Sequence, residues 1–234
     1  VIIYMRQKYL SLLMLMLMLV SCASHKNVHT SVDIYPKREF RGAWIQAVNG
    51  QFTGMGEQDM KKYLTDMLDN LQKVNVNAII FQVRVEGDAL YESRYEPWSR
   101  FLTGTQGKSP GWDPLAFMVD ECHRRNMELH AWINPYRART KGTAKVASTH
   151  RSAKNPADFI AYEGQLYFNP SLQSNRDYIC SIVRDIVNRY DVDGLHIDDY
   201  FYPYPISGEV FPDTTNFAND PRGFKNIGDW RRDN

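Results

Sequence analysis

The stretch Val192-Asp193-Gly194-Leu195-His196-Ile197-Asp198-Asp199-Tyr200-Phe201-Tyr202-Pro203 decides how this chain folds. It opens with a predicted turn at Asp193-Gly194 and continues as a short apolar run whose alternate positions become polar. In a strand, the two aliphatic residues would point one way, and His196, Asp198 and Tyr200 the other. Such a strand, with polar side chains gathered at its carboxyl end, predicts a barrel enzyme whose strand tips project into a common bowl. A strand that ends in a solvated Asp-Asp turn is the alternative.

Strand and helix patterns alternate along the rest of the chain. Short β-branched or aromatic runs predict strands, and apolar residues at helical spacing predict amphipathic helices. Strands that are separated by helices pair in parallel through right-handed crossovers. The predicted strands cover 40–48, 78–85, 127–133 and the stretch quoted above, and the predicted helices cover 57–74, 113–126 and 174–190.

The predicted fold class is α/β, and the predicted architecture is a (β/α)8 TIM barrel. A complete barrel usually needs about 250 residues, whereas residues 37–234 supply four strands and the start of a further segment at 227–234. We therefore expect residues 37–234 to be the N-terminal half of a barrel, truncated before its fifth strand. The alternative is a complete small four-strand α/β domain, which would have to keep an open sheet with polar strand tips.

Alternation along each strand predicts which side chains face the barrel interior. His130 and Trp132 share the inward face of the third strand. A doubly wound sheet normally has near-continuous apolar strands, so polar inward residues favour a barrel mouth. Long loops at that mouth, predicted at 86–112, 135–169 and 208–228, would carry the chemistry. The residues expected around one axis near the strand tips are Gln46, Arg84, Asn134, His196 and Asp198.

The N-terminal residues have the pattern of a sorting signal. A basic pair precedes the apolar run 10–20, which is shorter than the about 20 residues that span a bilayer and suits a signal peptide. The small residue before Cys22 resembles the lipobox of bacterial lipoproteins, in which the cysteine thiol is acylated. We expect residues 1–21 to be a lipoprotein signal peptide, residues 22–36 a flexible tether, and Cys22 the lipidation site. Ordinary secretion with cleavage nearby is the alternative.

The exported protein would be anchored by lipid to the bacterial envelope, on the periplasmic side of the outer membrane rather than on the surface. Removal of residues 1–21 takes away two basic residues and no acids, which changes the formal charge from +1 to −1. This balance gives no electrostatic footprint for nucleic acid. Cys122 and Cys180 lie in predicted helices, where a buried cysteine behaves as a small hydrophobe. An oxidising compartment leaves a disulfide between them open.

Several motifs together resemble the glycosyl-hydrolase-like family 10, whose members are bacterial secreted proteins and lipoproteins with a (β/α)8 catalytic domain. The resemblance implies glycoside hydrolysis, with peptidoglycan glycan strands as the substrate of an envelope lipoprotein. It also implies that the remaining half of the barrel is missing here. Glu86 follows Val85 where the family pattern suggests a proline after the arginine, which weakens a role for Glu86. The motifs are FRGAWI at 40–45, FQVR at 81–84, GDALY at 87–91, EPWS at 96–99, LTG at 102–104, HAWINPYR at 130–137, GLHIDDYFYP at 194–203 and IGDWRRDN at 227–234.

Glycosidases generally need two carboxyl groups, one protonated and one ionised. Asp198 is our candidate for the ionised group, because a cation near it, Arg84 or His196, would keep it charged. By analogy of fold alone, it lies where the α-amylase superfamily has its nucleophile. Asp199 has the opposite parity, so both catalysis and capping of loop amides stay open for it. The nearby carboxyl groups Glu86, Asp88 and Glu96 make no compelling acid, which leaves open an acid beyond residue 234.

The polar and aromatic residues near the strand tips suit a sugar substrate, since flat rings stack on the C–H faces of pyranoses; core packing is the alternative for each ring. A divalent-ion pocket of His130, His196, Asp198 and Asp199 is a rival prediction, but no HxH, HExxH or CxxC spacing supports it, so we expect no metal and no cofactor. A non-catalytic glycan-binding lipoprotein is the alternative function. The residues predicted to bind the polysaccharide are Gln46, Arg84, His130, Trp132, Asn134, Tyr136, Arg137, His196, Tyr200 and Tyr202.

Overall fold

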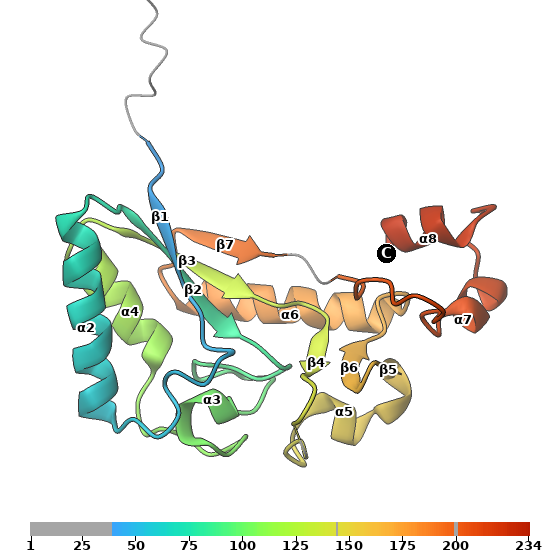
Figure 1. Ribbon diagram of the computed structural model, residues 1–234, viewed down its shortest axis with the longest axis horizontal. Coiled ribbons are helices and arrows are strands. Elements are labelled where there is room, and N and C mark those ends of the chain that lie inside the picture. Colours follow the sequence, from blue (N-terminus) through green and yellow to red (C-terminus); the bar gives the residue numbers. More distant parts are fainter. Residues whose placement is uncertain (1–38, 144, 199–200) are drawn as a thin grey trace, which may run out of the picture. The chain divides into compact units, whose positions relative to one another are not determined.

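The computed structural model describes residues 39–143, 145–198 and 201–234. The predicted signal peptide, tether and Cys22 lie outside these residues. Four parallel strands form the main sheet, and their order in the sheet follows their order in the chain (Figure 1). The strands are β1 (Gly42–Ile45), β2 (Ala78–Arg84), β3 (Glu128–Ile133) and β7 (Gly194–Ile197), and the connecting helices are α2 (Glu57–Lys73), α4 (Pro114–His123) and α6 (Gln173–Arg189).

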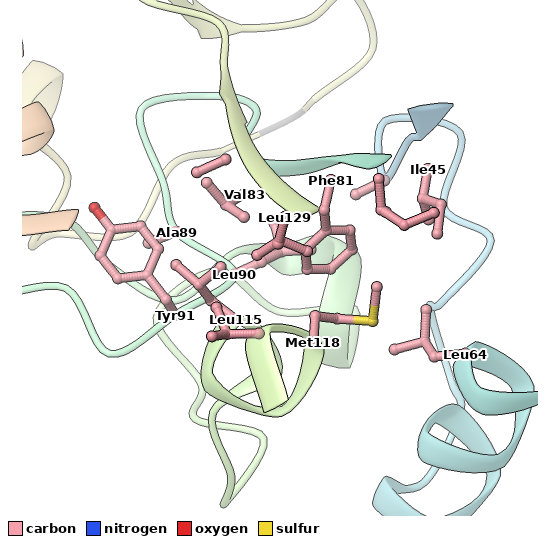
Figure 2. Packing of buried hydrophobic residues seen from close by; sticks show 14 of the residues in the cluster. Ile45, Leu64, Phe81, Val83, Ala89, Leu90, Tyr91, Leu115, Met118 and Leu129 are labelled. Atoms are coloured by element: carbon pink, nitrogen blue, oxygen red, sulfur yellow. The ribbon is translucent and has the colours of Figure 1, made fainter. Parts of the chain in front are cut away.

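The three long helices cover one face of this sheet. When parallel strands are added in one direction through right-handed crossovers, every helix falls on the same face. Buried side chains from all three helices and from β2 and β3 accordingly share one hydrophobic core, in which Leu64, Phe81, Leu115 and Leu129 meet (Figure 2). The opposite face carries the polar residues. Sequential order and one-sided helices are the arrangement of a barrel wall, so the α/β barrel prediction is confirmed at the level of fold class.

The start of β7 depends on a glycine for packing rather than for a turn. Gly194 is the first residue of the strand and pairs with His130 of β3. A Cβ atom at position 194 would lie 2.5 Å from Nδ1 of His130, so only glycine lets the imidazole lie against the backbone. Asp193 fixes the register, because its carboxylate accepts the backbone N–H of Leu129 at 2.8 Å. The predicted turn at Asp193-Gly194 is therefore wrong at its second residue.

The loop predicted at 135–169 contains a second, antiparallel sheet with the order β4-β6-β5. Its hairpin turns at Glu163-Gly164, where both residues have positive φ (51° and 72°). Asn-Gly or Asp-Gly is the strong sequence signal for such a turn, and glutamate in the first position hid it. The sheet consists of β4 (Arg137–Arg139), β5 (Phe159–Tyr162) and β6 (Gln165–Phe168), and the shorter helical elements are α3 (Arg100–Thr103), α5 (Arg151–Lys154), η1 (Pro156–Asp158), α7 (Thr214–Asn219) and α8 (Ile227–Asp233).

The two cysteines in the described residues are both free thiols. Cys122 is buried in the core between α4 and the sheet, whereas Cys180 is exposed on α6. The disulfide that the sequence left open is therefore not formed. Among the described residues, none of the helices combines the length and the apolar character that a membrane crossing needs.

Candidate functional site

A pocket of about 430 Å³ lies at the carboxyl ends of the strands, beside β1, and Met67 of α2 contributes to its lining. Trp132 comes from β3 and His196 from β7, and Asp198 follows β7 directly. Three of the residues expected around the barrel axis, Gln46, His196 and Asp198, thus line one pocket. The full lining is Trp44, Ile45, Gln46, Gln51, Met67, Trp132, His196 and Asp198.

A chain of side-chain amides holds the carboxylate of Asp198. Asn134 donates from Nδ2 to Oδ1 of Asp198 at 2.8 Å. Gln82 donates from Nε2 to Oδ1 of Asn134 at 2.6 Å. The Oε1 atom of Gln82 in turn accepts the backbone N–H groups of Ala47 and Val48, at 2.8 and 3.1 Å. Asp198 is therefore fixed to the loop after β1 through two neighbouring strands.

Two tryptophan rings lie against His196 in the same pocket. Trp44 of β1 donates from Nε1 to Nε2 of His196 at 3.4 Å, and the two rings meet edge to face. In a flat sheet these strands would be about 14 Å apart, at about 4.8 Å per neighbouring pair. The contact shows that side chains of the outer strands, β1 and β7, meet across the inward face, as they do in a sheet that curls like a barrel wall. Trp132 is 8% exposed, and its Nε1 is a buried donor without a hydrogen-bond partner among the described residues.

Arg84 pairs with a different carboxylate from the one that the sequence predicted. It is fully buried and forms a two-pronged ion pair with Glu96, with both N–O distances at 2.7 Å. Its remaining nitrogen, Nη1, donates to the carbonyls of Asn134 (2.5 Å) and Pro135 (2.9 Å). The prediction that Arg84 keeps Asp198 charged, or binds sugar, is therefore corrected: the guanidinium is used in joining the second-strand loop to the end of β3.

The two other nearby carboxyl groups are also engaged. Burial favours the neutral form of Glu86, but hydrogen bonds from Arg100 and Thr140 outweigh it and lower the pKa of Glu86 below its usual range. Burial dominates at Asp88 and raises its pKa to about 6, although Gln106 donates to the carboxylate at 3.0 Å. Neither group lines the pocket, so the described residues hold no partner carboxyl for Asp198 there.

Asp88 should make stability depend on pH. Its folded pKa of about 6 exceeds the ordinary value of 3.8, so between these values the folded chain holds more protons than the unfolded chain. The free energy of unfolding then falls as pH rises through this window, by about 2 to 3 kcal/mol at about 1.4 kcal/mol per pKa unit. Urea unfolding of wild type and Asp88→Asn at pH 4 and pH 6 checks this. From pH 4 to pH 6, the free energy of unfolding of the wild type should fall relative to that of Asp88→Asn. The same difference between the two proteins at both pH values would refute this prediction.

His130 lies far from the pocket, and this placement corrects the sequence prediction. It pairs with Gly194, the first residue of β7, whereas Asp198 follows the last residue of that strand. Its ring contacts Phe40, and its Nε2 lies 3.0 Å from the carboxylate of Glu128. Parity predicted the correct face but not the depth along the strand. This distance also removes His130 from the proposed divalent-ion pocket, and the described residues contain no cluster of three or more metal-ligating side chains.

Three further predicted residues lie in other surroundings. Tyr136 is buried beside Phe168, and Tyr202 hydrogen-bonds with Asn234 at 2.7 Å; both line a separate, mostly apolar pocket of about 670 Å³. Arg137 begins β4 and donates to the carbonyl of Val85 at 3.0 Å. These contacts correct the prediction that the three residues share one bowl with Asp198. Asp199 and Tyr200 lie outside the described residues.

Gln82 and Gln51 were not chosen from the sequence, yet they belong to this site. Gln51 lines the pocket, and Gln82 connects its neighbours. Gln82 has the same parity as Arg84 in the strand AIIFQVR, and a buried glutamine among its apolar residues is the signal that could have marked it. No comparable signal exists for Gln51, which lies in the loop after β1.

Comparison with known proteins gives a consistent family assignment. The profile of the family described as glycosyl hydrolase-like 10 matches residues 39–234. Glycosyl hydrolase YngK of Bacillus subtilis is 44% identical over 204 residues, which cover 84% of this chain and 40% of that protein. Glycosyl hydrolase DigH of Escherichia coli K12 is 40% identical over 182 residues, which cover 73% of this chain and 41% of that protein.

The chain thus spans about two fifths of the length of these curated relatives. Among solved structures, a hypothetical protein from Ruminiclostridium thermocellum is similar over 78% of this chain and 92% of its own, with 12% identity and a TM-score of 0.46. A maltogenic α-amylase, AmyB of Thermotoga neapolitana, is similar over 78% of this chain and 43% of its own, with 17% identity and a TM-score of 0.44.

Proposed function

The chain belongs to the glycosyl hydrolase-like 10 family, and from this membership we propose that it forms part of a glycoside hydrolase of the bacterial cell envelope. The observation that carries the proposal is the carboxylate of Asp198, held by Asn134 at 2.8 Å in a pocket walled by Trp44 and Trp132. An ionised carboxylate beside aromatic faces can attack an anomeric carbon or activate a water molecule. The exposed ring of Trp44 would stack on the sugar that is cleaved.

We propose peptidoglycan glycan strands as the substrate. The protein at the full length of its relatives would be incubated with purified glycan strands freed of peptides, and with starch and cellulose as controls. Release of new reducing ends from the peptidoglycan strands alone is the expected result. Cleavage of starch or cellulose instead, with the peptidoglycan strands intact, would overturn the substrate proposal while leaving glycoside hydrolysis in place.

A non-catalytic glycan-binding protein is the second candidate, and one observation favours it. Among the described residues that line the pocket, Asp198 alone carries a carboxyl group, whereas hydrolysis generally needs two. Binding of glycan strands measured by calorimetry, without release of reducing ends over many hours, would support this candidate. Turnover that depends on Asp198 would exclude it.

We also propose that the protein is exported and anchored to the envelope by a lipid on Cys22. The proposal rests on the apolar run and the small residue before Cys22. Cys22→Ser should abolish labelling by a palmitate analogue and release the protein into the soluble fraction. Cys180→Ser is the matched control, because this thiol is exposed and free, and that variant should stay labelled. A Cys22→Ser protein that remains in the membrane fraction would contradict the anchor.

A further inference from the structure

Asp198 lies at one end of a series of hydrogen bonds, and the backbone N–H groups at the other end determine which atoms donate along it. The backbone nitrogens of Ala47 and Val48 can only donate, so the atom of Gln82 that faces them must be its oxygen. The amide nitrogen of Gln82 is then left for Asn134 and must meet an oxygen. This leaves the Nδ2 group of Asn134 for Asp198. The loop after β1 therefore determines that Asp198 receives a hydrogen-bond donor.

We propose that Gln82 is a positioning residue that acts on Asp198 through Asn134, and we name these three side chains the amide relay. The relay keeps a donor aimed at the carboxylate, which favours the ionised form that a nucleophile or base requires. Its consequence for hydrolysis rests on the proposed function, whereas the relay itself does not.

Burial makes the direction of the relay hard to reverse. Gln82 is 0% exposed and Asn134 is 2% exposed, so water cannot replace a lost partner. A buried polar group left without a partner costs about 1 to 3 kcal/mol. Rotating either amide would set two donors or two acceptors against each other at distances of 2.6 to 2.8 Å. A buried network of this kind specifies one arrangement of its members.

A purely structural role for Gln82 makes a different prediction from a relay. If Gln82 only caps the loop after β1, a glutamate could replace it, because a carboxylate oxygen accepts the N–H groups of Ala47 and Val48 equally well. In the relay, an ionised glutamate at position 82 would present a second acceptor to Asn134. Asn134 would then turn its nitrogen toward position 82 and its oxygen toward Asp198. The variant Gln82→Glu thus separates the two roles.

The decisive measurement is the titration of Asp198, followed by carbon NMR of its carboxyl group in the full chain. In Gln82→Glu we expect Asp198 to titrate at least one pH unit higher than in the wild type, a tenfold weaker acid. Asn134→Leu removes the middle of the relay at similar volume. If the relay carries the effect, the shift that Gln82→Glu causes should fall below half its size in the Asn134→Leu background. A shift that persists unchanged would be direct repulsion between charges, and it would overturn the proposal.

Two further measurements keep the test independent of folding and of hydrolysis. In the wild type, titration of Asp198 should move the side-chain amide resonances of both Asn134 and Gln82, whereas the exposed amide of Gln72 should not respond. A silent Gln82 amide would overturn the relay even if the variants do not fold. If the wild type also hydrolyses glycan, the acid limb of the pH profile of kcat/KM should move to higher pH in Gln82→Glu. A coupled titration without any hydrolysis would leave the relay in place and refute the proposed function.

Discussion

Asp198→Asn is expected to lower kcat/KM for glycan strands by at least about a thousandfold, in the protein at the full length of its relatives. Each factor of ten corresponds to about 1.4 kcal/mol of barrier, so the loss is about 4 kcal/mol. Asparagine keeps the shape of the side chain, and its oxygen can still accept the hydrogen bond from Asn134, now 2.8 Å from the carboxylate. What disappears is the negative charge that attacks the anomeric carbon or stabilises positive charge in the transition state.

Asp199→Asn is the matched comparison, since it removes the same charge at the next position. Reducing-end release and the unfolding midpoint would be measured for both variants, so that a loss of activity is not confused with a loss of fold. We expect Asp198→Asn to have the larger effect on turnover and little effect on the midpoint. Near-normal turnover by Asp198→Asn would remove it from catalysis and move the nucleophile to Asp199 or to a more distant residue.

Sequence periodicity predicted the strands of the main sheet because neighbouring side chains of a strand point to opposite faces, which is a local property of the backbone. In β3, Leu129, Ala131 and Ile133 alternate with His130 and Trp132, and this alternation indicates which face meets the helices. Asn134 and Asp198 were therefore assigned to the correct face and meet in the structure. Alternation predicts the face on which a side chain lies, but it does not predict how far along the strand, and so how close to the pocket, that side chain lies. His130 satisfies the same parity but pairs with Gly194 at the start of β7, far from Asp198.

The roles of individual polar residues depended on partners that sequence spacing does not reveal. Arg84 has a bulge in the pairing beside it, between Gln82 and Arg84, and finds Glu96 in the following loop. Nothing in the spacing of those residues distinguishes a buried ion pair from a sugar-binding guanidinium. The placement of Tyr202 depended on Asn234, which is 32 residues away along the chain. Contacts of this kind form only when the fold is complete.

Arg84→Met is expected to destabilise the fold by about 3 to 5 kcal/mol, the usual cost of breaking a buried ion pair from one side. The side chains of Arg84 and Glu96 are 0% and 1% exposed, so the variant leaves a carboxylate without charge compensation and without water. It also removes the donor for the carbonyls of Asn134 and Pro135. The expected loss in the free energy of unfolding comes mainly from the buried, unpaired charge of Glu96, and less from the lost attraction between Arg84 and Glu96.

Chemical unfolding of four proteins tests this account. The double variant Arg84→Met/Glu96→Leu should recover part of the loss, because replacing both ions by apolar groups removes the unpaired charge. Lys62→Met is the surface control: Lys62 and Asp66 are 74% and 59% exposed, and such pairs contribute at most about 1 kcal/mol. If Arg84→Met were no more harmful than Lys62→Met, the ion pair would not hold the second-strand loop, and Arg84 would again be available for Asp198 or for sugar. Full recovery in the double variant would instead assign the whole cost to the uncompensated carboxylate and none to the two carbonyls.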